Sequence, residues 1–173
     1  MFGRFKFLYK GLKNVTIDSK HSHIYLKDTN LPLIILRPWD IIQLGELVGS
    51  GSEDIIIWIG KTIGKSLCAA VKEKDDPKTR KELLEDILSY LEQFGFGRFS
   101  IEKYLEAKQV VIAVDSPLEE GLEGGEIIQN LYNGVLCGVF EESGLEVEGI
   151  LKEHVLAGGE RDVFEFNFFE EVV

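Results

Sequence analysis

The sequence predicts an α+β fold in which helices pack on one face of an antiparallel sheet. Three observations predict this class. The first 37 residues alternate as short strands do, three helical patterns follow between residues 38 and 95, and the last third places a glycine-containing helix between strands. The 173 residues, 45% of them hydrophobic, suffice for one domain with a core. We expect a single domain over 1–173, with N-terminal strands over 1–37 and a core over 38–173.

Short alternating segments predict two or three strands near the N-terminus. Residues 15–17 and 24–26 alternate apolar and polar side chains, and 33–36 is a continuous apolar run. Asp28-Thr29-Asn30 predicts a turn. Pro38 then suits the first position of a helix over 38–48, where its missing N–H costs nothing.

A second helix is expected from Ser52, a good N-cap, to about Lys74, after the break at Gly49-Ser50-Gly51. Its apolar residues leave only a narrow polar strip at Lys61, Lys65 and Lys72. A helix that is apolar on most sides is expected to be buried on most sides.

The third helix is expected to open at Asp76 and Pro77 and to close at Gly95. One of its faces is apolar and predicts packing on a core: Leu83, Leu84, Ile87, Leu88, Leu91 and Phe94.

Two strands, a helix and a hairpin complete the prediction. Phe99 and Ile101 indicate one strand, and the β-branched run 109–115 indicates a more buried one. Residues 126–143 form the fourth helix, which Gly144 ends. A hairpin follows, with strands over 145–156 and 163–169.

Composition excludes several classes of function. The net charge of −11 repels phosphate backbones, so neither nucleic acid nor an anionic membrane is an expected partner. No apolar stretch is long enough to insert in a membrane. Cys68 and Cys137 lie in apolar helical patterns without Cys-x-x-Cys spacing, which favours reduced thiols and a cytoplasmic protein over a disulfide scaffold or a zinc site.

Motifs that suggest chemistry lack the context the chemistry needs. Gly60-Lys61-Thr62 and Gly64-Lys65-Ser66 resemble the end of a phosphate-binding loop, but both fall inside a predicted helix whose amides are already used. His21-Ser22-His23 has no carboxylate or cysteine cluster beside it in sequence, which favours a solvated turn over a metal site, and His154 is expected at the surface. No catalytic constellation emerges.

Paired glycines carry more information. Gly60 and Gly64 lie four residues apart on the second helix, and Gly134 and Gly138 do so on the fourth. Each helical glycine costs about 1 kcal/mol relative to alanine, so four of them need a reason. Tight helix packing within the chain, a dimer seam, and space for a bound ligand are all compatible with this spacing.

The last third resembles the 4-vinyl reductase domain family. The resemblance rests on residues 128–141, which carry Gly134 and Gly138, on 153–159 with its glycine turn, and on Phe164-Glu165-Phe166; weaker agreement extends it over about 35–169. It implies a ligand-binding fold similar to that of the Golgi transport-particle (TRAPP) subunits and related to nitric-oxide-sensing haem domains. It also implies that the core binds a small hydrocarbon or lipid and that the protein forms a homodimer.

The sequence departs from the family at its cysteines. Many members carry cysteines proposed as metal ligands, which would fall here near Gln129, Leu156 and Phe164. We therefore expect no metal. Haem is not expected either, because all three histidines lie outside the predicted helices, and no other cofactor is expected.

Two function hypotheses follow. In the first, the protein is a non-catalytic sensor or adaptor domain, with an apolar pocket closed by the second and fourth helices against the sheet. The residues expected to line it by dispersion contacts are Trp58, Ile59, Ile63, Leu136, Phe140, Phe164 and Phe166. In the second, the same side chains fill a core and the protein is a dimerising scaffold without a ligand. A reductase-associated component is a third, less favoured alternative.

Overall fold

The computed structural model describes residues 15–29, 31–74, 79–115, 117–118 and 121–169. The N-terminal part is a small antiparallel sheet in the order β1-β2-β3, with β1 at Val15–Asp18, β2 at His23–Leu26 and β3 at Pro32–Leu33. Leu26, which is buried, joins this sheet to the main hydrophobic core. The predicted strands over 15–17 and 24–26 are confirmed, whereas the run 33–36 is a strand only at Leu33.

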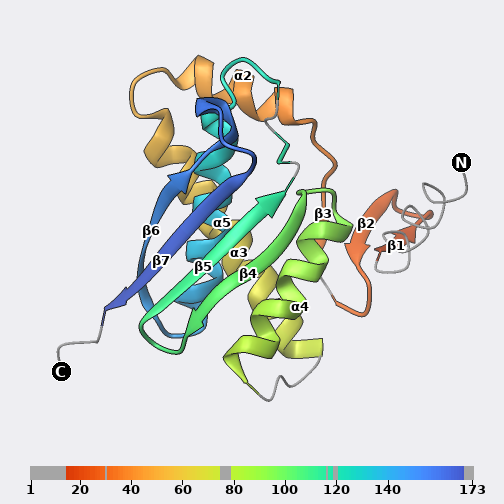
Figure 1. Cartoon of the computed structure of the whole chain (residues 1–173). Helices are drawn as coiled ribbons and strands as arrows, with labels where there is room; N and C mark the ends of the chain where they lie inside the picture. Colours follow the sequence, from red (N-terminus) through yellow and green to blue (C-terminus); the bar gives the residue numbers. More distant parts are fainter. Residues whose placement is uncertain (1–14, 30, 75–78, 116, 119–120, 170–173) are drawn as a thin grey trace, which may run out of the picture.

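Three helices follow (Figure 1). Helix α2 spans Pro38–Val48 with its proline at the first position, as predicted, and helix α3 spans Ser52–Lys74. Helix α4 spans Arg80–Gln93, and the hydroxyl of its N-cap Thr79 accepts a hydrogen bond from the Glu82 N–H at 3.1 Å. The predicted start at Asp76 and Pro77 lies outside the described residues.

The main sheet has four antiparallel strands in the order β4-β5-β7-β6. Strands β4 and β5 form one hairpin, at Arg98–Leu105 and Gln109–Asp115. Strands β6 and β7 form the other, at Glu146–Glu153 and Asp162–Phe169, with a single 3-10 turn between them. The side chains that alternate toward the helices are almost all apolar, and those in the two central strands are fully buried: Val110, Ile112, Val114, Phe164 and Phe166.

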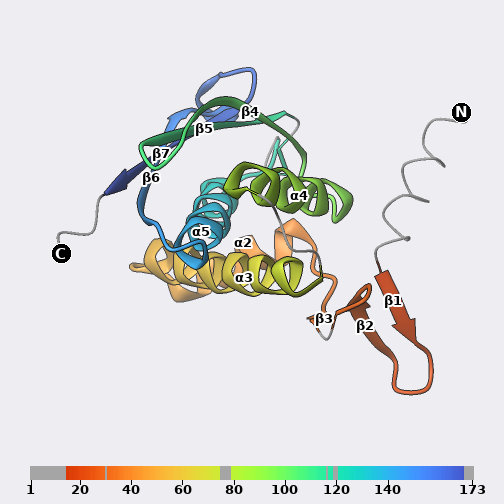
Figure 2. The same cartoon turned by 90° about the horizontal axis from the view of Figure 1, so that it is seen from below.

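Helix α5, Glu126–Glu142, lies between the sheet and α3 (Figure 2). The molecule is therefore layered, with the sheet first, α4 and α5 against one of its faces, and α2 and α3 beyond α5. Nearly every residue of α5 from Ile128 to Phe140 is buried. This arrangement confirms the predicted fold class, with helices on one face of an antiparallel sheet.

Helix α3 differs from its prediction. Its inner side is buried against α5, but Ile55, Trp58 and Ile63 on its outer side are exposed by 43%, 67% and 40%. The helix that is buried on most sides is α5, which has the sheet on one side and α3 on the other. Within the described residues, no helix combines the length and apolar character needed to cross a bilayer.

Candidate functional site

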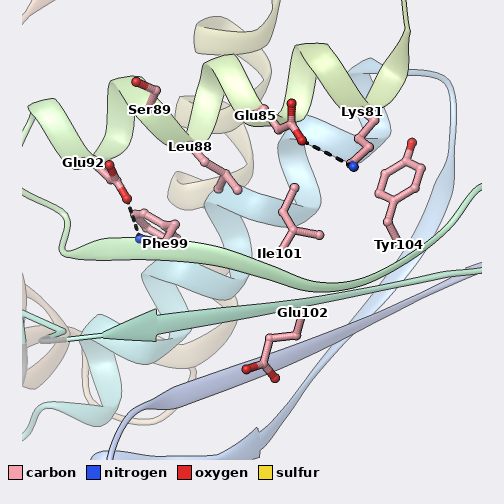
Figure 3. A pocket seen from close by; sticks show the side chains of 9 residues that line it. All are labelled: Lys81, Glu85, Leu88, Ser89, Glu92, Phe99, Ile101, Glu102 and Tyr104. Carbon is pink, nitrogen blue, oxygen red and sulfur yellow. Dashed lines mark hydrogen bonds and ion pairs between the residues drawn. The ribbon is translucent and has the colours of Figure 1, made fainter.

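A groove of about 600 Å³ lies between α4 and β4 (Figure 3). One face of α4 forms one wall, because its contributing residues recur every three or four positions: Lys81, Glu85, Leu88, Ser89 and Glu92. Strand β4 forms the other wall with Phe99, Ile101, Glu102 and Tyr104. The groove lies at the edge of the sheet, since β4 pairs only with β5.

A bulge in β4 shapes the floor of the groove. The register with β5 shifts between Ile101 and Lys103, so the alternation of faces is interrupted there. Phe99, Ile101 and Tyr104 thus share the side that faces α4, while Glu102 points away from the helix (Figure 3). Arg161 holds that outward carboxylate at 2.5 Å. The floor is apolar apart from one phenol hydroxyl.

Polar groups stand along the α4 side. Lys81 and Glu85 form an ion pair at 3.6 Å, and Glu92 accepts a hydrogen bond from the Phe99 N–H at 2.8 Å. Two carboxylates and one ammonium therefore face the groove, which leaves it with a negative balance. Such a rim disfavours an anionic ligand.

Tyr104 also lines a second pocket, nearly closed at about 10 Å³, between α4, α5 and the sheet. Phe140 of α5 and Phe168 of β7 line the same pocket, and their rings are in edge contact with centroids 5.0 Å apart. Burial raises the pKa of the Tyr104 hydroxyl, and the nearby Glu106 raises it further. This side chain therefore stays neutral near pH 7. It lines both the open groove and the inner pocket.

The residues predicted to line a pocket fall into two groups. Leu136, Phe140, Phe164 and Phe166 are buried together, with the Phe140 and Phe166 rings 5.1 Å apart. Trp58 and Ile63 lie on the outer side of α3, and Ile59 is half-buried. Helix α5 lies between α3 and the sheet (Figure 2), and the half-buried Ile59 packs against the core. Of the predicted set, only Phe140 lines either of the hollows described above.

The four helical glycines pack against one another across α3 and α5. A Cβ atom on Gly60 would lie 2.7 Å from the Leu131 carbonyl oxygen, and one on Gly134 would lie 3.0 Å from the Gly60 Cα. Gly64 and Gly138 likewise meet backbone atoms of the facing helix. Of the three explanations that the spacing left open, tight packing within the chain is the one observed, so neither a dimer seam nor a ligand occupies these glycine faces.

The three family metal-ligand positions hold one polar residue, Gln129, and two apolar residues, Leu156 and Phe164. Gln129 donates to both carboxylate oxygens of the buried Asp162, at 3.3 and 3.4 Å, and that carboxylate accepts the Val155 N–H at 2.9 Å. Among the described residues no group of three or more His, Cys, Asp or Glu side chains could hold a metal ion. His154, predicted at the surface, is half-buried, and its Nδ1 has no hydrogen-bond partner there.

Sequence reasoning missed the groove. The polar face of α4 has the pattern of any solvated helix face, and no turn or glycine signal in the sequence marks the bulge in β4. The one available signal was the pair of aromatic residues Phe99 and Tyr104, whose odd spacing of five residues cannot keep both on one face of a regular strand.

No family model matches the chain, and no curated protein matches it in sequence. The chain does match solved structures in fold. The phenol-responsive sensory domain of the transcription activator PoxR, solved with phenol, aligns with a TM-score of 0.78 at 13% identity over 98% of this chain and 92% of that one. This chain has the fold of that sensory domain.

Three further solved structures share the fold. Trafficking protein particle complex subunit 3 from Naegleria fowleri, covalently bound to palmitic acid, aligns with a TM-score of 0.57 at 17% identity, over 77% of this chain and 95% of that one. A vinyl-4-reductase family protein from Methanocaldococcus jannaschii gives 0.53 at 20% identity, over 79% and 85%. An H-NOX protein from Shewanella oneidensis gives 0.56 at 12% identity, over 96% and 90%. The fold that the family resemblance implied is therefore confirmed.

Proposed function

We propose that this protein is a non-catalytic sensor or adaptor domain that binds a small, neutral apolar or aromatic molecule in the groove between α4 and β4, and that it acts as a homodimer in the cytoplasm. The observation that carries the proposal is the groove itself. Its volume of about 600 Å³ falls in the range of small-molecule sites. Leu88, Phe99 and Ile101 line it, and Leu88 and Phe99 are largely buried, so most of the accessible lining is polar.

The charges at the groove narrow the class of ligand. Glu85 and Glu92 outnumber Lys81, so a carboxylate or phosphate ligand would enter against a net negative field. A neutral ring with a single hydroxyl suits the site better, because its ring would contact the apolar floor while the hydroxyl meets Ser89 or a rim carboxylate.

Tyr104 extends the proposal toward the core. A turn of its side chain would connect the groove to the small inner pocket beside Phe140 and Phe168. An apolar ligand could then reach Phe140, one of the residues predicted to line a pocket, and bury more of its surface than the groove alone permits. The PoxR domain with its phenol, and the trafficking subunit with its palmitic acid, support small-molecule binding as a use of this fold.

The alternative, a dimerising scaffold without a ligand, is favoured by a different observation. Helices α3 and α5 meet at backbone contact along their glycines, which leaves no room between them, and the inner pocket at about 10 Å³ is close to the size of one water molecule. Under this alternative the α4–β4 groove is a surface depression only.

Calorimetric titration with phenol, with benzoate as the anionic counterpart, separates the two functions. Ser89→Trp would place an indole in the groove from an exposed position, whereas Ser100→Trp makes the same change on an exposed residue of β4 outside the groove lining. We expect phenol to bind the native protein and Ser100→Trp alike, Ser89→Trp to lose at least about tenfold in affinity, and benzoate to bind more weakly than phenol. Absence of phenol binding, or an undiminished affinity in Ser89→Trp, would favour the scaffold.

A further inference from the structure

Strand β4 has one backbone edge that opens toward the groove. The strand pairs with β5 alone, and its Phe99 N–H points away from β5, because it donates to the Glu92 carboxylate of α4 at 2.8 Å (Figure 3). Backbone groups alternate in direction along a strand, so the N–H and C=O of Ile101 point to the same edge. Within the residues that the structure describes, neither group of Ile101 has a hydrogen-bond partner at this edge. The edge can therefore accept a further strand.

The length of the groove suits an extended chain. Its two walls run side by side, with Lys81 beside Tyr104 at one end and Glu92 beside Phe99 at the other (Figure 3). At about 1.5 Å per helical residue and about 3.3 Å per strand residue, both walls are about 16 Å long. About five residues of an extended chain fit along that distance, whereas a ring the size of phenol would fill only part of it.

The charges around the groove favour a cationic chain. Glu85 and Glu92 face it from α4 against one cation, Lys81, in the described lining, and the protein as a whole has a net charge of −11. Lysine or arginine side chains of an added strand would lay their apolar stems on Leu88 and bring their charges to Glu85 and Glu92. A strand with acidic side chains would meet the same two carboxylates at a cost.

We propose that an extended, cationic segment of another protein binds in the α4–β4 groove as an added strand beside β4. Its backbone pairs with the N–H and C=O of Ile101, and its charged side chains pair with Glu85 and Glu92. This segment is a partner in addition to the small molecule of the proposed function. Both would cover Phe99 and Ile101, so a bound ring would exclude the strand and give the sensor an output. That exclusion, unlike the strand site itself, rests on the proposed function.

Calorimetric titration of the full chain with two blocked heptapeptides tests the charge preference. One peptide alternates valine with lysine, and the other alternates valine with glutamate. We expect the lysine peptide to bind with a Kd of about 10–100 µM and the glutamate peptide to bind at least about tenfold more weakly. Glu85→Lys should weaken binding of the lysine peptide at least about tenfold, whereas Glu73→Lys, the same charge change on an exposed residue of α3, should weaken it less than about threefold. No binding of the lysine peptide at about 1 mM, equal binding of both peptides, or an equal loss in both variants overturns the proposal.

Amide hydrogen exchange at Ile101 locates the added strand. The lysine peptide should slow exchange of this amide at least about tenfold. Ile101→Pro removes the edge N–H without removing a hydrogen bond of the sheet and should weaken the peptide, whereas Ile101→Val keeps the N–H and the affinity. Circular dichroism verifies folding, and if Ile101→Pro does not fold, the exchange measurement on the native protein decides. Binding that leaves the Ile101 amide unprotected overturns the proposal. So does protection that rises with protein concentration alone, because a second copy would then occupy the edge.

The strand site and the ligand site are separable, because both peptide measurements are made without phenol. Binding of the lysine peptide by a protein that binds no phenol would uphold the strand site and refute the ligand site. Phenol binding without peptide binding would do the reverse. If both bind, saturating phenol should weaken the lysine peptide at least about threefold, and an unchanged affinity would refute the exclusion.

Discussion

Gly60→Ala is the substitution that most directly tests how α3 and α5 pack. The added Cβ would lie 2.7 Å from the Leu131 carbonyl oxygen, 2.8 Å from the Val135 nitrogen and 2.9 Å from the Gly134 Cα. All three are backbone atoms, so no side chain can rotate away and the helices must separate. Overpacking costs about 1–3 kcal/mol, and a rigid neighbour places this site at the upper end. The better helix propensity of alanine returns about 1 kcal/mol.

We therefore expect Gly60→Ala to lower the free energy of unfolding by about 2 kcal/mol, or the Tm by about 4–8 °C, in urea and thermal denaturation at one fixed protein concentration. Gly45→Ala is the matched control. Its Cβ would meet only side-chain atoms of Ile127, which can move, so its stability should be unchanged or slightly higher. If Gly60→Ala matched the control, the close approach of α3 and α5 would be refuted.

Three further predictions concern titration, reactivity and buried polarity. Burial would raise the pKa of Glu141, but hydrogen bonds from Lys61 and Lys65 outweigh it and hold that pKa below its ordinary value. The resulting stability is present at neutral pH and is lost as pH falls below about 4.5, so denaturation should show Glu141→Gln less stable than wild type at pH 7, with the gap closing in acid. Burial raises the pKa of the Cys137 thiol to about 11, so a thiol reagent at about pH 8 should leave it unmodified until denaturant is added; rapid native labelling would contradict its burial. Asp162→Ala should lower the unfolding free energy by about 1–3 kcal/mol in urea titrations, because it leaves the buried Gln129 amide and the partly buried Val155 N–H without their acceptor, and a neutral effect would count against these hydrogen bonds.

Local signals carried most of the fold. Pro38 correctly marks the first residue of α2, and the β-branched run from Gln109 to Asp115 is a strand over the same residues. Gly144, with φ of 79°, ends α5 as predicted. These elements are predictable because proline geometry, β-branching and a left-handed glycine each act within a few residues.

Properties that depend on distant partners were not predictable. Helices α3 and α5 are both rich in apolar residues. Their sequences do not show that α5 is covered on two sides, by the sheet and by α3, whereas the outer side of α3 is exposed. The glycine spacing predicted close approach but left the partner open, and only the facing glycines of α5 decide it. The groove lies between α4 and the bulged edge strand β4. Its lining residues, from Lys81 to Tyr104, come from both of these elements, so no local pattern in either one predicts it.

The same packing decides which helix can respond to a ligand. Helices α3 and α5 are held at backbone contact, so a small shift between them would open voids or clashes along several turns. Helix α4 has the groove on its β4 side and meets the inner pocket through Leu84. A molecule that enters beside Tyr104 would therefore displace α4 and leave the α3–α5 pair fixed.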